Sequence, residues 1–123
     1  MNPVTRLSQI IEALVRARPS LMTTLDLDHP AWIDAGVPLD AGDPDAVFPC
    51  VRIDGLTQDR AKQVTYTALV KLWSQDLSGG FLDHAELFCA ALQTTPGLLC
   101  ETYLHRPEAA LNCAVFPVTF YSS

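Results

Sequence analysis

The stretch from Lys62 to Gln93 constrains the fold most, because the spacing of its apolar residues changes once from that of a strand to that of a helix. Its first part, KQVTYTALVKLWSQD, is rich in β-branched and aromatic residues and carries apolar side chains on both faces at a period of two. Ser78-Gly79-Gly80 then permits a sharp turn, and apolar residues recur at helical spacing until Pro96. The stretch predicts a long strand covered on both sides, a tight turn and a helix.

A second helix is expected at the N-terminus. Asn2 can cap it and Pro3 suits the first helical position, while Pro19 stops it. The other predicted strands are Leu21–Leu27, Val47–Asp54, Leu98–His105 and Ala109–Tyr121, with a polar turn at residues 55–60. Because proline cannot donate a ladder hydrogen bond, Pro49 favours an edge or the beginning of a strand, and Pro117 favours a bulge or an edge.

These elements predict one α+β domain over residues 1–123. Since the strands are mostly joined by short turns, we expect a mixed, mainly antiparallel sheet of about four to five strands with two helices packed on it.

A long irregular loop at residues 28–46 interrupts this pattern with three prolines, two glycines and five aspartates. It is too apolar for a linker because it contains four candidate anchors, Trp32, Ile33, Val37 and Leu39. Its acidic residues include Asp34, Asp40, Asp43 and Asp45. The pattern indicates docking, either on the chain's own domain or on a neighbouring protein, and both readings stay open.

The charge of the chain excludes some function classes. Its 14 acidic and 8 basic residues give a net charge of −6, which repels phosphate and disfavours DNA wrapping or specific DNA reading. Such a surface suits a protein past which DNA slides. No apolar run is long enough to span a membrane, and the N-terminus lacks the apolar core of a signal peptide, so we expect synthesis in the cytoplasm.

Residues capable of chemistry form no recognisable site. Cys50, Cys89, Cys100 and Cys113 contain no CxxC pair and are expected to be buried small hydrophobes, with a Cys100–Cys113 disulfide as the alternative. Asp26, Asp28 and His29 could hold a hard cation, but their spacing matches no known calcium loop. Cys89 with His84 could form a nucleophile pair, yet Cys89 lies on the apolar stripe of its helix. We therefore assign no catalytic, cofactor-binding or metal-binding residue.

Several segments together carry a resemblance that covers nearly the whole chain. They are the helix TRLSQIIEALV, the irregular loop, the strand VFPCVRID, the unit VTYTALVKLWSQD with SGGFLDHAELFCAALQ, and the strands LLCETYLH and AALNCAVFPVTFY. In this order they resemble the tail terminator (tail completion) proteins of long-tailed bacteriophages such as lambda, and their small relatives in prophages and gene transfer agents. The segment LWSQDLSGGFLDHAELFCAAL is the most similar to the family.

The resemblance implies a non-enzymatic ring protein, a homo-hexamer that needs no cofactor. Such a ring caps the tail tube, joins it to the head connector and lets DNA pass without specific binding. The protein would be made in the host cytoplasm, would not contact a membrane, and would end up in the tail or neck of the virion. Trp32, Ile33, Val37 and Leu39 would contact a neighbouring subunit or the tube. Asp34, Asp40, Asp43 and Asp45 would form an acidic lumen or loop face.

Three other readings stay open. The chain could be another connector, stopper or neck protein, since these have a similar size. It could be a small metal-dependent enzyme that uses the Asp- and His-rich loop, in which case Asp26 and Asp28 would be needed for metal binding. It could also be a monomeric binding or adaptor domain with the same layered fold.

Overall fold

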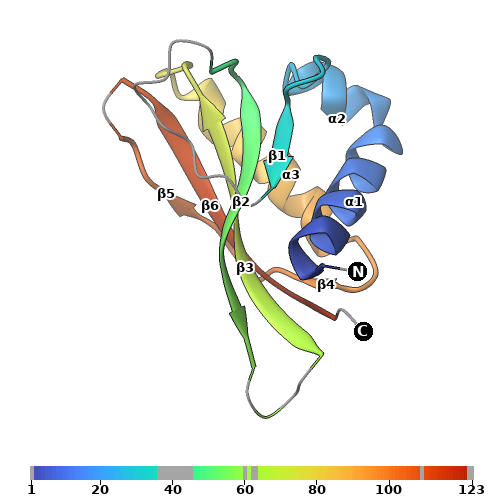
Figure 1. Cartoon of the computed structure of the whole chain (residues 1–123). Coiled ribbons are helices and arrows are strands. Elements are labelled where there is room, and N and C mark those ends of the chain that lie inside the picture. The colour runs from blue at the N-terminus through green and yellow to red at the C-terminus, as the bar shows by residue number, and fades with distance from the viewer. Residues whose placement is uncertain (1, 36–45, 60, 62–63, 109, 122–123) are drawn as a thin grey trace.

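The computed structural model describes residues 2–35, 46–59, 61, 64–108 and 110–121 of the chain. The described elements are α1 (Pro3–Arg16), α2 (Pro19–Thr24), β1 (Ile33–Ala35), β2 (Cys50–Gln58), β3 (Thr65–Ser74), α3 (Gly80–Gln93), β4 (Leu98–Leu99), β5 (Leu104–His105) and β6 (Asn112–Tyr121). The strands form one sheet in the order β1-β2-β3-β6-β4, and β5 also pairs with β6 (Figure 1). β1 runs parallel to β2, and the other described pairings are antiparallel. This is the predicted α+β fold, with three helices and six strands.

The long strands β3 and β6 form the middle of the sheet. They pair without a shift from Thr65 opposite Tyr121 to Ser74 opposite Asn112. Side chains alternate between the two faces of a strand. This single register therefore determines which side chains of β3 and β6 lie on each face of the sheet. Lys62 to Asp76 was predicted as one long strand, and β3 lies within it.

All three helices lie on one face of the sheet (Figure 1). The core on this side, here called the helix-side core, combines buried apolar residues of the helices with the inward-facing residues of the strands. Its largest fully buried members include Leu7, Ile11, Leu27, Ile53, Leu72, Phe81, Phe88, Leu92, Phe116 and Phe120. Phe88 of α3 meets Phe116 of β6 at an interplanar angle of 62° with ring centroids 5.1 Å apart, an edge-to-face arrangement that is favourable for aromatic rings.

The opposite face of the sheet carries a smaller apolar group, here called the outer cluster: Cys50, Trp73, Leu111, Cys113 and Val115. Beside it, the Lys71 ammonium lies 3.1 Å from a carboxylate oxygen of Asp54 on the neighbouring strand. Both faces of β3 therefore carry buried side chains, as its apolar residues on both faces predict.

Both predicted helices are present, and the start of α1 is held by the residues that mark it in the sequence. The Asn2 side chain accepts a hydrogen bond from the Val4 amide at 2.8 Å, and Pro3 is the first helical residue. Before α3, the Ser78 amide donates to Asp76 Oδ1 at 2.8 Å; hydrogen bonds from Ser78 hold the pKa of Asp76 below its usual value. None of the described helices is long and apolar enough to cross a membrane.

Residues 21–27 were predicted as a strand, and this is wrong, because Pro19 to Thr24 form α2. Pro19 occupies the first helical position, where its missing N–H costs nothing. Leu21 and Leu25 are spaced by one helical turn and both are buried in the helix-side core. The alternation of apolar and polar residues in LMTTLDL fits a strand equally well, so the pattern alone could not separate the two.

The strands on either side of the long loop also differ from their predicted bounds. Ile33–Ala35 lies in the predicted loop but forms β1 beside β2. β2 begins after Pro49, as that proline suggests, and continues to Gln58 through residues that were expected to turn. The continuation is possible because Gly55 takes a φ of +65° and the pairing with β3 shifts between Asp54 and Thr57.

Replacing Phe88 by alanine should reduce the free energy of unfolding by about 3–5 kcal/mol, because it removes a fully buried ring and leaves a cavity against Phe116. Urea unfolding followed by circular dichroism would measure this. Leu87→Ala is the matched control on the next residue of α3: its side chain is 46% exposed, and the loss should stay below about 1 kcal/mol. Equal losses for both variants would contradict the packing described.

Candidate assembly surface

The edge of the sheet beside β6 is split in two. Leu98–Leu99 pairs with β6 at one end and Leu104–His105 pairs with it further along, so residues 100–103 leave the ladder. These residues lie instead against α3. The Tyr103 hydroxyl donates to Glu86 Oε1 at 2.9 Å, and the Gln93 side-chain amide donates to the Glu101 carbonyl at 2.9 Å. The predicted strand Leu98–His105 is therefore interrupted, because its middle bonds to a helix.

Pro117 occupies the matching position on β6. It pairs with Leu69 of β3 on one side, without a bulge. On the other side, no described residue pairs with 116–118. A proline is tolerated at such a position because it has no N–H to leave unbonded. The prediction that Pro117 marks a bulge or an edge is thus correct in part. β6 is an inner strand and has no bulge at Pro117, but among the described residues no strand pairs with it there on the side away from β3.

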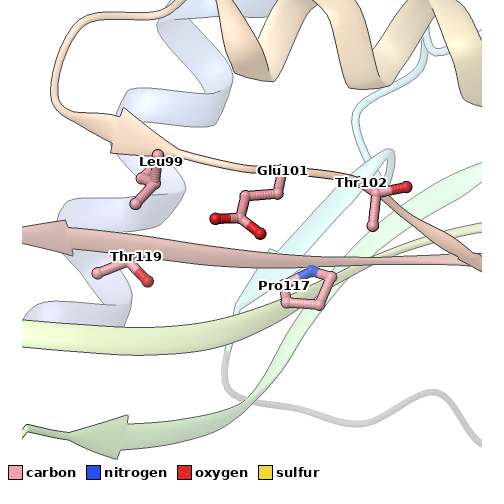
Figure 2. A pocket seen from close by; sticks show the side chains of 5 residues that line it. All are labelled: Leu99, Glu101, Thr102, Pro117 and Thr119. Atoms are coloured by element: carbon pink, nitrogen blue, oxygen red, sulfur yellow. The ribbon is translucent and has the colours of Figure 1, made fainter.

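The split leaves a hollow of about 250 Å³ beside β6, lined by Leu99, Glu101, Thr102, Pro117 and Thr119. Figure 2 shows the side chains of Leu99, Glu101 and Thr102 reaching from the edge segment toward β6, where Pro117 and Thr119 lie. The hollow has one carboxylate and two threonine side chains, a set that offers hydrogen bonds but neither a nucleophile with its base nor a metal site. It is suited to receiving a side chain rather than to catalysis.

Exposed apolar side chains surround this hollow on the outer face. Leu99 pairs with Thr119 and Leu104 pairs with Val115, so both point away from the helices, as Pro117 and Tyr121 do. Leu99 is 60% exposed, Leu104 50% and Tyr121 64%, and Pro117 is also exposed. We call Leu99, Leu104, Pro117 and Tyr121 the edge strip. Exposed apolar side chains on one face of a sheet commonly mark a surface that another protein covers.

The far half of the β2–β3 hairpin projects past the helices (Figure 1). We call its described residues from Leu56 to Gln58 and from Val64 to Tyr66 the arm. Its apolar residues Leu56 and Val64 are 37% and 45% exposed. Threonines continue from the arm across the outer face of the sheet: Thr57 pairs with Thr67, and the Thr67 and Thr119 hydroxyls are 3.3 Å apart. The arm projects with these two apolar side chains partly exposed, and the exposed acidic residue Asp59 follows it directly.

The residues that the sequence singled out in the long loop are only partly described. Trp32 is 5% exposed and belongs to the chain's own helix-side core, and its carbonyl accepts a hydrogen bond from the Val51 amide. Ile33 is half-buried and Asp34 exposed, both in β1. Val37, Leu39, Asp40, Asp43 and Asp45 lie outside the described residues. Trp32 thus anchors β1 to its own domain, and whether the loop also contacts a neighbour stays a prediction.

The candidates for metal binding and catalysis are not brought together. His29 Nε2 lies 2.7 Å from the Pro49 carbonyl, and Asp26 and Asp28 are exposed. Across the described ranges, no group of three His, Cys, Asp or Glu residues could hold a metal ion. Cys89 is buried, and its burial raises the pKa of the thiol. These positions therefore supply no argument for an enzyme.

The four cysteines are buried free thiols on opposite faces of the sheet. Cys89 and Cys100 belong to the helix-side core, whereas Cys50 and Cys113 belong to the outer cluster. The alternative of a Cys100–Cys113 disulfide is therefore wrong, because the sheet separates the two side chains. Burial raises the pKa of Cys100 to about 11 and that of Cys113 to about 12.

Comparison with known proteins bears on the fold. No protein-family model matches the chain, and no curated protein matches its sequence. A chain in a solved structure described as the virion of a native gene transfer agent (GTA) particle matches with a TM-score of 0.62 and 14% sequence identity, over 98% of each chain. The two chains share a fold. At this identity the match concerns the architecture alone, but it extends over almost the whole length of both proteins.

The edge strip and the arm were not singled out from the sequence. Leu99 and Leu104 sit in LLCETYLH, where alternation predicts a strand but not which of its residues face solvent. That information depends on the register with β6 and on the departure of residues 100–103 toward α3. The one sequence feature that pointed to this irregularity was Pro117, because a proline indicates that strand pairing beside it is interrupted.

The bend that directs the arm depends on Gly55. Gly55→Ala should lower the free energy of unfolding by about 1–2 kcal/mol, because φ is +65° and the added Cβ would lie 3.1 Å from Leu69 Cδ1. Gly79→Ala is the control, since no atom lies within 4 Å of its added Cβ; its effect should stay within about 0.5 kcal/mol. Chemical denaturation of the two variants tests this, and equal stabilities would argue against a glycine-dependent bend.

Proposed function

We propose that this chain is a structural protein of a phage-like particle and, more specifically, the tail terminator that completes the tail. In this role six copies form a ring, which caps the tail tube and joins it to the head connector. It works without a cofactor or a catalytic step. The observation that carries the proposal is the match in fold to a chain of a gene transfer agent virion over 98% of both chains.

The surface of the chain supports assembly with other proteins. The edge strip and the arm leave apolar side chains exposed at two separate places, which is expected of a subunit that contacts one neighbour with one surface and another neighbour with the other. Head-to-tail contacts of this kind close into a ring when the rotation that relates neighbouring copies is a whole-number fraction of 360°. The long loop, with Ile33, Val37 and Leu39, would add contacts to the adjacent subunit or to the tube, and Trp32 would hold the base of the loop.

The charge of the chain supports passage of DNA. A net charge of −6 repels the phosphate backbone, so DNA can move through a ring without being held. Asp34 is exposed on β1 and would contribute to an acidic loop face, together with Asp40, Asp43 and Asp45.

A connector or stopper protein of the neck is the alternative within the same class. The match to a virion chain supports both roles, and their binding partners distinguish them. A terminator binds the end of a tail tube, whereas a connector binds the portal side of the neck. Binding of the purified chain to polymerised tail tubes, seen as a density at the tube end in negative-stain images, would favour the terminator.

The first test is the mass of the protein in solution by light scattering, with negative-stain images of the same sample. Six copies of the 13.4 kDa chain would weigh about 80 kDa. A ring near this mass, or capping of added tail tubes by a protein that is monomeric alone, is the expected result. A monomer that neither assembles nor binds tail tubes would overturn the terminator role.

The edge strip should be needed for assembly. Leu99→Asp places a charge on an apolar contact, so the apparent association constant between copies, or with the tail tube, should fall at least about tenfold, or about 1.4 kcal/mol. Leu77→Asp is the matched control, because Leu77 is 64% exposed in the turn before α3 and outside the strip. Sedimentation over a range of concentrations measures the effect, and melting temperatures confirm that both variants fold. Equal assembly by the two variants would exclude the edge strip as a contact.

A further inference from the structure

The hollow beside β6 contains a carboxylate without a counter-ion. Figure 2 shows the Glu101 side chain directed into the space between the edge segment (residues 98–105) and β6. Within the part of the chain that the structure describes, this carboxylate forms no ion pair and no hydrogen bond. It is therefore available to a ligand that brings a positive charge and hydrogen-bond donors.

The edge segment holds this carboxylate in place. The Gln93 side-chain amide donates to the Glu101 carbonyl and the Tyr103 hydroxyl donates to Glu86, both at 2.9 Å, so the segment is bonded to α3 at two points. Cys100 is 5% exposed and buried in the helix-side core, whereas the next residue, Glu101, is exposed and lines the hollow. The hollow thus exists in the isolated chain, and a binding site formed in advance lowers the entropic cost of binding.

The walls of the hollow suit an aliphatic chain that ends in a group with several N–H donors. Leu99 and Pro117 supply apolar surface, along which methylene groups can pack. Thr102 and Thr119 add hydroxyl oxygens, which can accept hydrogen bonds beside the carboxylate. Pro117 has no N–H group of its own that would need a partner.

The volume of the hollow indicates the size of the side chain. A space of about 250 Å³ corresponds to roughly eight water molecules at about 30 Å³ each. An arginine side chain has nearly as many non-hydrogen atoms, and its planar guanidinium can pair with a carboxylate through two parallel hydrogen bonds. A lysine side chain is shorter, and its ammonium lacks this planar fork.

Other classes of ligand fit the hollow less well. None of the described residues that line it is basic, so an anion would meet only the repulsion of Glu101. A hard metal ion binds several oxygen ligands, whereas the hollow offers one carboxylate. A purely apolar side chain would cover the carboxylate without giving it a partner, which costs free energy.

We propose that this hollow is a binding site for an arginine side chain, and that the arginine is supplied by a different protein, the subunit at the end of the tail tube.

The charge of the chain favours a different protein over a second copy as the source of the arginine. Copies that each carry a net charge of −6 repel one another, whereas a basic segment of another protein is attracted to the acidic surface. Some of the chain's own arginines are also already bonded: Arg16 lies 3.6 Å from Glu12, and Arg18 donates to the Leu14 carbonyl. The choice of the tail-tube subunit rests on the proposed function, but the chemistry of the hollow does not.

The first experiment titrates the folded chain, labelled with nitrogen-15, with N-acetylarginine amide and follows its amide signals by NMR. We expect saturable shifts at Leu99, Thr102 and Thr119, with a dissociation constant of roughly 1–10 mM, since the probe contains little more than the side chain. N-acetylcitrulline amide has nearly the same shape but no charge, so it should bind at least about threefold more weakly.

Two variants separate the carboxylate from the net charge of the chain. Glu101→Gln keeps the shape of the side chain and removes its charge, so the affinity for N-acetylarginine amide should fall at least about threefold. Glu108→Gln is the matched control, because it makes the same change at an exposed glutamate outside the hollow, and it should bind as the parent does. The arginine site is overturned if the probe gives no saturable shifts around the hollow, if the citrulline probe binds equally well, or if the two variants bind alike.

A second experiment identifies the source of the arginine. Sedimentation of the same variants measures self-association, and co-sedimentation with polymerised tail tubes measures binding to the tube. Glu101→Gln should weaken tube binding at least about threefold and leave self-association unchanged, whereas Glu108→Gln should match the parent in both. A loss of self-association would assign the arginine to a second copy and overturn the proposed source. A parent chain that does not bind tubes would overturn the terminator role together with that source, and the NMR titration decides the arginine site in either case.

Discussion

The antiparallel ladder between β3 and β6 is the interaction on which the remaining structure depends. Its uninterrupted register, from Thr65 opposite Tyr121 to Ser74 opposite Asn112, sends one set of side chains to the helices and the other to the outer face. A shift by one residue would exchange the two sets and expose Phe116 and Phe120. The three helices, the outer cluster and the edge strip are all arranged with respect to these two strands.

The third helix has two roles that follow from its position on this ladder. Its apolar face closes the helix-side core through Phe88, while Glu86 and Gln93 bind the edge segment. The bonds to the segment replace those that a continuous edge strand would make with β6. The same helix thus contributes to stability and determines the shape of the exposed edge, so a change on its polar side alters a surface that lies beyond the segment.

Much of the fold could be predicted from the sequence, since the long strand, the glycine turn and two helices have strong local signals. The elements that were wrong or missing depend on contacts between distant residues. LMTTLDL fits a strand and a helix alike, and only the core decides between them. β1 is short and exists because Ile33–Ala35 pairs with β2. For the surface, the aromatic and apolar residues of the loop were visible, but the exposure of Leu99, Leu104 and Tyr121 follows from register, which composition does not reveal.

The broken edge opposite Pro117 limits how this protein can associate with itself. A continuous exposed strand invites main-chain pairing with any other strand, and such pairing can repeat without end into a fibre. Here the edge is interrupted at residues 100–103, and the exposed carboxylate of Glu101 lies at the interruption. Main-chain pairing at this edge is limited to the short strands β4 and β5, so contacts there depend more on the fit of side chains. The interruption opposite the proline therefore disfavours open-ended strand pairing at this edge.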